Sequence, residues 1–360
     1  MTGELPESKK SWDSFGRAVS PAAVMLFLIG MLLASALMAA SIGAAKISLR
    51  LAVETILSQG FNGASASRDQ LILLSIRLPR IAMASIVGAL LAAAGTVMQG
   101  LFRNPLADPG LIGVSAGAGF AAAATIVVGD KIFPDALMSS PFLLPVVAFF
   151  GALATTVILY RVATWQGRTS IATMLLAGLA LGALASAGTG LLVFLADDRQ
   201  LRDITFWMLG SLSGATWSKV TAIVPFLFLF LLFSPFAARG LDLLVLGEAE
   251  AFHMGIAVQR LKRVSIVLVA AIAGAAVSAS GVIGFVGIVV PHLLRLTIGP
   301  GHRLLLPASA CCGAGLLLVA DTFARTVASP AEIPIGIVTA LIGAPFFLLL
   351  LRRQRALLAS

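Results

Sequence analysis

The sequence predicts an all-α polytopic membrane protein with about ten transmembrane helices. Of its 360 residues, 59% are hydrophobic and 11% are charged, whereas a soluble domain carries about a quarter charged residues. The apolar runs are long and do not alternate with polar residues, which indicates spanning helices of about 20 residues rather than barrel strands of about ten. The 35 glycines fit close packing between helices in lipid, where small residues let backbones approach.

The apolar runs divide the chain into successive spans with short connections. An even number of spans places both termini on one side of the membrane. The runs are 21–43, 80–102, 110–129, 141–162, 171–195, 219–237, 264–280, 282–298, 304–323 and 334–351.

Basic residues indicate which side is the cytoplasm. Arg260, Lys262 and Arg263 lie in one predicted connection, and clusters of this kind stay on the cytoplasmic side. The same bias accounts for most of the net charge of +9, so we expect a lipid bilayer and no nucleic acid as partner. This gives a cytoplasmic segment 1–20, a transmembrane domain 21–352 and a cytoplasmic tail 353–360.

Two segments hint at an internal repeat. Residues 95–105 read GTVMQGLFRNP and residues 281–291 read GVIGFVGIVVP, with the same spacing from the first glycine to the final proline. Five predicted spans separate them, and an odd number would place the two halves of the chain in inverted orientation.

The stretch from Arg77 to Gly119 carries a family resemblance. It contains RLPR at 77–80, GTVMQ at 95–99 and NPLADPGLIGVSAGAG at 104–119. These motifs resemble the permease subunits of bacterial ABC importers for iron–siderophores, haem and vitamin B12. The resemblance implies the type II ABC importer permease fold, multi-pass in the bacterial inner membrane. It also implies a homodimer that works with two cytoplasmic ABC ATPase subunits and a periplasmic binding protein.

Three arginines lie at predicted outer ends of spans, where the positive-inside bias should have removed them. They are Arg77, Arg80 and Arg325. Arginine at a membrane edge is often a snorkelling anchor, and the alternative is a docking surface for an acidic partner. The family resemblance favours docking, because the matching arginines in these permeases receive glutamates of the binding protein, and Arg–carboxylate pairs are directional.

A short segment of mixed polarity follows the sixth span. It reads LGEAEAFHMGI at 246–256 and has a glycine near each end, which would allow a helix lying across the membrane face. An ordinary interfacial loop is the alternative. The segment resembles the coupling loop of the family, so we expect residues 246–258 to contact the ATPase, above all Leu246, Gly247, Glu248, Ala251, Phe252, Met254 and Gly255.

Small residues recur every four positions on the fifth span, at Gly178, Gly182, Ser186 and Gly190. Such a stripe usually serves helix packing. The fifth span lines the translocation path in the family, so these residues are also candidates for that path.

The segment TFWMLGSLSGATW at 205–217 is most similar to haem importers, which favours haem as the transported substrate over a ferric siderophore or cobalamin. The residue types that usually hold haem iron include His253, His292, His302 and Tyr160, and all four fall on the predicted cytoplasmic side. We therefore expect a conduit without a permanently bound cofactor or metal.

No enzyme motif is present. The sequence lacks GxxxxGK[ST] and HExxH, so ATP would be bound and hydrolysed by the partner subunit. The alternative class is an ion-coupled secondary transporter, which would need acidic residues inside the membrane. Asp108, Asp321 and Glu332 lie near predicted span ends instead.

Overall fold

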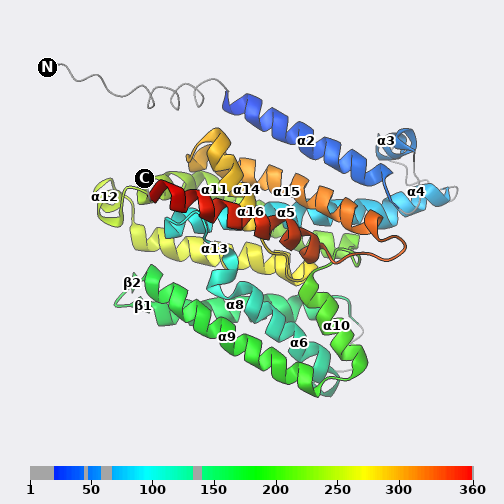
Figure 1. Ribbon diagram of the computed structural model, residues 1–360, viewed down its shortest axis with the longest axis horizontal. Helices are drawn as coiled ribbons and strands as arrows, with labels where there is room; N and C mark the ends of the chain where they lie inside the picture. The colour runs from blue at the N-terminus through cyan, green and yellow to red at the C-terminus, as the bar shows by residue number, and fades with distance from the viewer. Residues whose placement is uncertain (1–19, 44–47, 58–66, 133–139, 359–360) are drawn as a thin grey trace.

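The computed structural model describes residues 20–43, 48–57, 67–132 and 140–358. Within them, ten apolar helices cross the molecule between two ends (Figure 1). Seven are long and apolar enough to span a membrane, and α6, α14 and α16 contain shorter apolar segments. The ten are α2 (Pro21–Ser41), α5 (Leu78–Phe102), α6 (Val114–Ile132), α8 (Leu143–Ala163), α9 (Ile171–Leu195), α11 (Trp217–Leu244), α13 (Val258–Ser280), α14 (Val286–Ile298), α15 (His302–Val327) and α16 (Ile335–Leu358).

The connections gather at two opposite ends (Figure 1). At one, called the α12 end, lie α12 (Glu248–His253) and a hairpin of β1 (Thr164–Trp165) and β2 (Arg168–Thr169). At the other, called the α10 end, lie α3 (Leu49–Leu57), α4 (Arg68–Ile72) and α10 (Asp198–Leu209). Helix α2 begins and α16 ends at the α12 end, as expected for an even number of spans.

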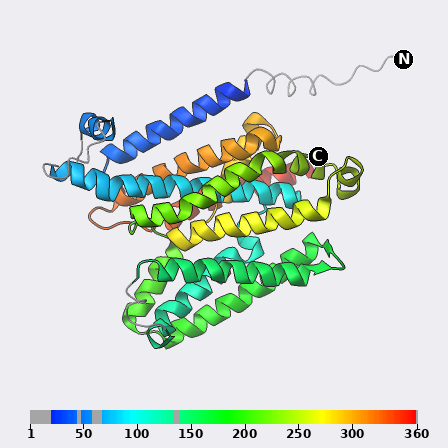
Figure 2. The ribbon, with the colours of Figure 1, turned by 180° about the vertical axis from the view of Figure 1, so that it is seen from behind.

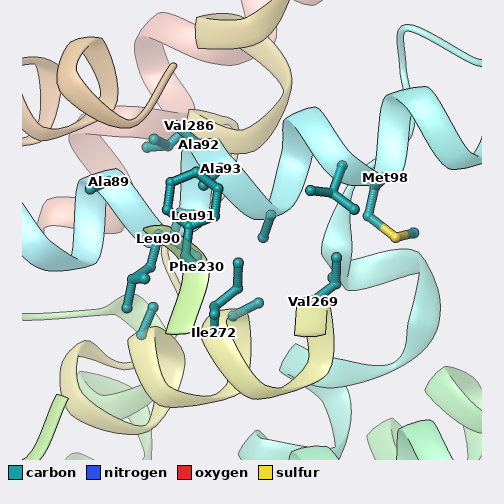
Figure 3. Close-up of a cluster of buried hydrophobic side chains, with 14 of the residues drawn as sticks. Ala89, Leu90, Leu91, Ala92, Ala93, Met98, Phe230, Val269, Ile272 and Val286 are labelled. Atoms are coloured by element: carbon teal, nitrogen blue, oxygen red, sulfur yellow. The ribbon is translucent and has the colours of Figure 1, made fainter. Parts of the chain in front are cut away.

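Helix α5 is the centre of the bundle. Most of its residues are buried, and it packs against α11, α13, α14 and α15. Figure 3 shows Leu90 and Leu91 of α5 close to Phe230 of α11 and Ile272 of α13. Helices α6, α8 and α9 form a second group that meets the first through α13 (Figure 2).

Local sequence signals explain where α5 begins and ends. Its first turn contains Pro79, which suits a position where the missing N–H is not needed, and a short π-helical turn, η1 (Leu73–Arg77), precedes it. Arg103 ends the helix in the left-handed conformation with φ of 50°. Asn104-Pro105 then prevents the helix from continuing, and the chain turns through η2 (Pro109–Ile112) into α6.

The predicted fold class is confirmed. The two segments with the same glycine-to-proline spacing, however, do not lie at equivalent positions in the two halves of the chain. The first five spans begin with α2, which starts at the α12 end, and the last five begin with α11, which starts at the α10 end, so the halves run in opposite senses. Gly95 lies inside α5 and Pro105 in the following loop, whereas Gly281 follows α13 and Pro291 lies inside α14. One segment leaves a helix and the other enters one.

Several boundaries differ from the sequence expectation because helices extend beyond the apolar core. Helix α13 starts at Val258 and so includes the basic cluster at 260–263. Helix α16 continues to Leu358, through most of the segment assigned to the tail. The segment assigned to the N-terminus lies, except for its last residue, outside the described residues.

Candidate functional site

Helix α12 is a short turn of helix held between two glycines. Gly247 has φ of 124° and Gly255 has φ of 85°, a region that other residues rarely adopt. An added Cβ at either glycine would meet no atom within 4 Å, so these glycines serve backbone conformation rather than packing. They allow the chain to leave α11, form α12 and return into α13.

Polar contacts fix α12 to its neighbours. The Glu248 carboxylate lies 2.7 Å from the Lys262 ammonium, and Lys262 also donates to the Thr169 carbonyl at 3.0 Å. Gln259 accepts from the Thr169 backbone N–H at 3.0 Å. Because Lys262 is almost fully buried, losing Glu248 would leave an uncompensated charge. The hairpin, α12 and α13 therefore form one connected unit.

The outer face of this unit is apolar and open. Phe252 is 67% exposed and Leu246 63% exposed, and Met254 is also exposed, while Ala251 is buried beneath them. A cavity of about 610 Å³ lies beside α12, lined by Arg168, Glu248, Ala249, Phe252, His253, Ala257, Val258, Gln259 and Arg260. Exposed apolar side chains beside a basic cavity are typical of a surface that another protein covers.

Sequence reasoning identified the α12 segment but missed the hairpin that supports it. Its turn residues, Gln166 and Gly167, both have positive φ, as a type I′ hairpin turn requires. Strands of two residues give almost no alternating pattern, so only the Gln-Gly pair signalled the turn.

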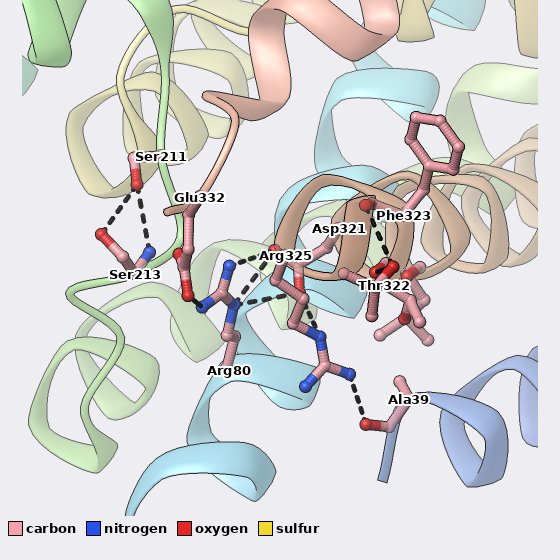
Figure 4. A network of polar contacts seen from close by, with 11 residues as sticks. Ala39, Arg80, Ser211, Ser213, Asp321, Thr322, Phe323, Arg325 and Glu332 are labelled. Carbon is pink, nitrogen blue, oxygen red and sulfur yellow. Dashed lines mark hydrogen bonds and ion pairs between the residues drawn. The ribbon is translucent and has the colours of Figure 1, made fainter. Parts of the chain in front are cut away.

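The predicted docking arginines lie close together at the α10 end, where each binds another part of the chain. Figure 4 shows Arg80 and Arg325. Arg80 donates to both carboxylate oxygens of Asp321 at 2.9–3.1 Å and to Glu332 at 2.8 Å. The side chains of Arg80 and Asp321 are only 11% and 4% exposed, whereas Glu332 is 39% exposed. That Asp321 and Glu332 bind Arg80 was not predicted from the sequence.

Arg77 and Arg325 bind the last turn of α2. Arg77 donates to the carbonyl of Ala40 and Arg325 to the carbonyl of Ala39. The final carbonyls of a helix have no partner within it, so these two arginines cap α2 and tie it to α5 and α15. All three arginine side chains bind other parts of the chain, and their docking role stays a prediction.

The small-residue stripe of α9 divides into two parts. A Cβ at Gly178 would lie 2.0 Å from the carbonyl oxygen of Leu111, so Gly178 serves the close packing of α9 on η2. Around Gly182 and Gly190 there is open space, and Ser186 is exposed. Gly178 thus makes the close packing contact that such a stripe usually serves, and the path role of the four residues stays a prediction.

The residue types that bind haem iron have other contacts here. His302 Nδ1 lies 2.6 Å from an Asp242 carboxylate oxygen, Tyr160 accepts from Arg263 at 3.2 Å, and the His292 ring packs against Phe346. Among the described residues, no three His, Cys, Asp or Glu side chains cluster as a metal site would require.

The Arg80 network gives a stability prediction. Replacing Arg80 with Met leaves the buried Asp321 carboxylate without its main partner, so Arg80→Met is expected to destabilise the fold by about 3–5 kcal/mol. The exposed Arg50–Glu54 pair is the matched control, and Arg50→Met should cost less than about 1 kcal/mol. Thermal unfolding of the full chain in detergent measures both, and equal midpoints for the two variants would contradict the buried network.

Comparisons with known proteins agree with this architecture. The FecCD transport family matches residues 26–353. The chain is 45% identical to the hemin transport system permease protein HmuU of Yersinia pestis, over 94% of this chain and 97% of that protein. It is 44% identical to the cobalamin import system permease protein BtuC of Halobacterium salinarum, over 79% of this chain and 74% of that protein.

A solved structure shares the fold. It is described as an inward-facing conformation of a metal-chelate type ABC transporter and superposes with a TM-score of 0.76 at 32% identity, covering 92% of this chain and 99% of that one. From the family match, these relatives and the ten-helix fold, the chain belongs to the FecCD transport family and is the membrane permease of an ABC importer.

Proposed function

We propose that this permease works as a homodimer that moves haem from a periplasmic binding protein to the cytoplasm by alternating access. Two ATPase subunits bind and hydrolyse ATP at the α12 end, which faces the cytoplasm of a bacterial inner membrane. The observation that carries this proposal is the α12 unit, which combines an exposed apolar face with a buried charged anchor, Lys262.

The α12 unit has the properties that a coupling surface needs. Its contact residues, Leu246, Phe252 and Met254, are open to a partner. Its base is fixed to α13 through Glu248 and Lys262, so a push on α12 acts on a spanning helix rather than on a loose loop. A rigid connection of this kind suits transport by movement of whole bodies.

Helix α9 supplies the proposed dimer contact and path. Few of its residues are buried in the single chain, and Leu176, Leu184 and Leu191 are exposed. A second copy would cover such a face, and Gly182, Ser186 and Gly190, which carry small or no side chains, would leave room for a bulky substrate near it. The path of the proposal runs along these three residues.

Haem is the proposed substrate because the similarity to the hemin permease extends over 97% of that protein, against 74% for the cobalamin permease. The segment that resembles haem importers lies in α10 and the loop after it, at the α10 end. A ferric siderophore or cobalamin is the alternative substrate for the same machine.

Docking of the binding protein is proposed at the α10 end, on Arg77, Arg80 and Arg325. Glu332 covers the open side of the Arg80 guanidinium and is itself 39% exposed. A carboxylate of the binding protein would take the place of Glu332 there, while Asp321 keeps the inner side of Arg80. Arg77 and Arg325 would hold α2 in position around this contact.

Removing the Glu332 charge tests this docking exchange. Glu332→Gln weakens an internal competitor for Arg80, so the binding protein is expected to bind the reconstituted complex several-fold more tightly. Glu54→Gln, which likewise removes an exposed acid paired with arginine at the α10 end, should leave the affinity unchanged. Weaker binding by Glu332→Gln, measured by surface plasmon resonance, would argue against the exchange.

Truncating Phe252 tests the coupling surface. Phe252→Ala removes a large exposed ring from the proposed contact, and loss of such an anchor commonly costs about 2 kcal/mol or more, so the affinity for the ATPase subunit should fall at least tenfold. Phe150→Ala removes an exposed ring on α8 and serves as the control. Equal ATPase affinity for the two variants would show that Phe252 is not part of the contact.

Uptake into liposomes tests the substrate. With the ATPase inside, ATP-dependent accumulation is expected when the binding protein is loaded with haem and not when it is loaded with a ferric siderophore or cobalamin. Uptake of one of the other two alone would replace haem and leave the machine intact. Haem uptake without an ATPase would contradict the proposed energy source.

A further inference from the structure

A second basic cavity lies at the α12 end, away from the α12 unit. Helices α11 and α15 run side by side (Figure 2), and between them is a cavity of about 690 Å³. Arg239 of α11 and Arg303 of α15 line it, together with the hydroxyl-bearing Ser234. The remaining lining is Pro235, Ala238, Asp242, Leu243, Leu306 and Pro307.

The two arginines keep their charge available. Asp242, the one acid in the lining, is engaged with His302: one of its oxygens accepts from the His302 backbone N–H at 2.8 Å and from ring Nδ1 at 2.6 Å. Within the described part of the chain, no ion pair or side-chain hydrogen bond engages the guanidinium of Arg239 or Arg303. The cavity therefore presents two cationic groups that suit an anion with several acceptor oxygens.

The arginines lie at the depth of lipid headgroups. Helix α11 has 28 residues and is about 42 Å long at 1.5 Å per residue, whereas the hydrocarbon core is about 30 Å thick. Arg239 precedes the end of α11 by five residues, or about 7.5 Å, and Arg303 is the second residue of α15. Both side chains thus reach the zone where phosphates of a bilayer lie.

An apolar stripe continues from the cavity toward the middle of the membrane. Leu229, Leu232 and Phe236 of α11 are 43%, 70% and 76% exposed. Their spacing, continued to Arg239, follows one face of a helix. An acyl chain lying on this stripe would place its headgroup at Arg239, with Arg303 on the other side of the cavity.

We propose that the cavity between α11 and α15 binds an anionic glycerophospholipid of the bilayer. Arg239 and Arg303 hold the phosphate, and one acyl chain lies along Leu232 and Phe236. Basic pockets between spanning helices are suited to anionic headgroups for this reason. The lipid would bridge the C-terminal end of α11, which leads directly into α12, and the N-terminal end of α15.

Binding of phosphatidylglycerol to the full chain in detergent, followed by native mass spectrometry, tests this site. The wild type is expected to bind phosphatidylglycerol at least tenfold more tightly than phosphatidylcholine. Arg239→Gln/Arg303→Gln should lose at least tenfold in phosphatidylglycerol affinity. Arg161→Gln/Arg352→Gln removes the same charge from exposed positions on α8 and α16 and should bind like the wild type.

Further measurements distinguish the possible ligands and control for misfolding of the double variant. Phe236→Ala keeps both arginines and should weaken phosphatidylglycerol several-fold, and added phosphatidylglycerol should raise the unfolding temperature of the wild type but not of the double arginine variant. Displacement of the lipid by millimolar glycerol phosphate or inorganic phosphate would overturn the lipid in favour of a soluble phosphate. Unchanged lipid binding by the double variant would overturn the site, and a parallel loss of ATPase affinity would assign the arginines to a protein contact.

Discussion

The close approach of α5 to its neighbours is the constraint on which the rest of the structure depends. A Cβ at Gly88 would lie 2.3 Å from the carbonyl oxygen of Gly313, and one at Gly95 would lie 2.0 Å from that of Gly287. Lipid tails are as apolar as the helix surfaces, so association in a membrane depends on such backbone contact more than on burial of apolar area. Because α5 is held against α14 and α15, its first and last turns have fixed positions at the α10 end and the α12 end of the molecule.

Each end then uses buried charge to attach a peripheral element to the core. At the α10 end, Arg77 and Arg325 bind the last carbonyls of α2, an outer helix that is mostly exposed. At the α12 end, Lys262 binds both Glu248 and the hairpin carbonyl of Thr169. Hydrogen bonds from charged donors are stronger than those between neutral groups, which suits elements that must present a surface in one geometry.

The spans could be predicted from the sequence because about twenty apolar residues are a length set by the bilayer itself. What could not be predicted depends on partners distant in the chain. The sequence gives no sign that Arg80 would meet Asp321 and Glu332, more than 240 positions away, so the acids that bind this predicted docking residue could not be named. Gly178 and Gly182 are likewise identical in sequence pattern, yet only Gly178 faces another backbone. The α12 segment was recognised because both of its signals, the two glycines and the amphipathic stretch between them, are local.

In the proposed coupling, a push on α12 would travel through these contacts. Glu248 and Lys262 join α12 to α13, α13 packs along α5, and α5 carries Arg80 at its far end. Because these helices are packed at close range and cannot deform gradually, a displacement of α12 that preserves the ion pair moves α13 with it and strains its contact with α5. Helices α6, α8 and α9 meet this core mainly through α13, so the contact between the two helix groups is the one that can change while each group stays intact. The exposed side of α9, where Gly182 and Gly190 leave open space, belongs to the group that would move relative to α5.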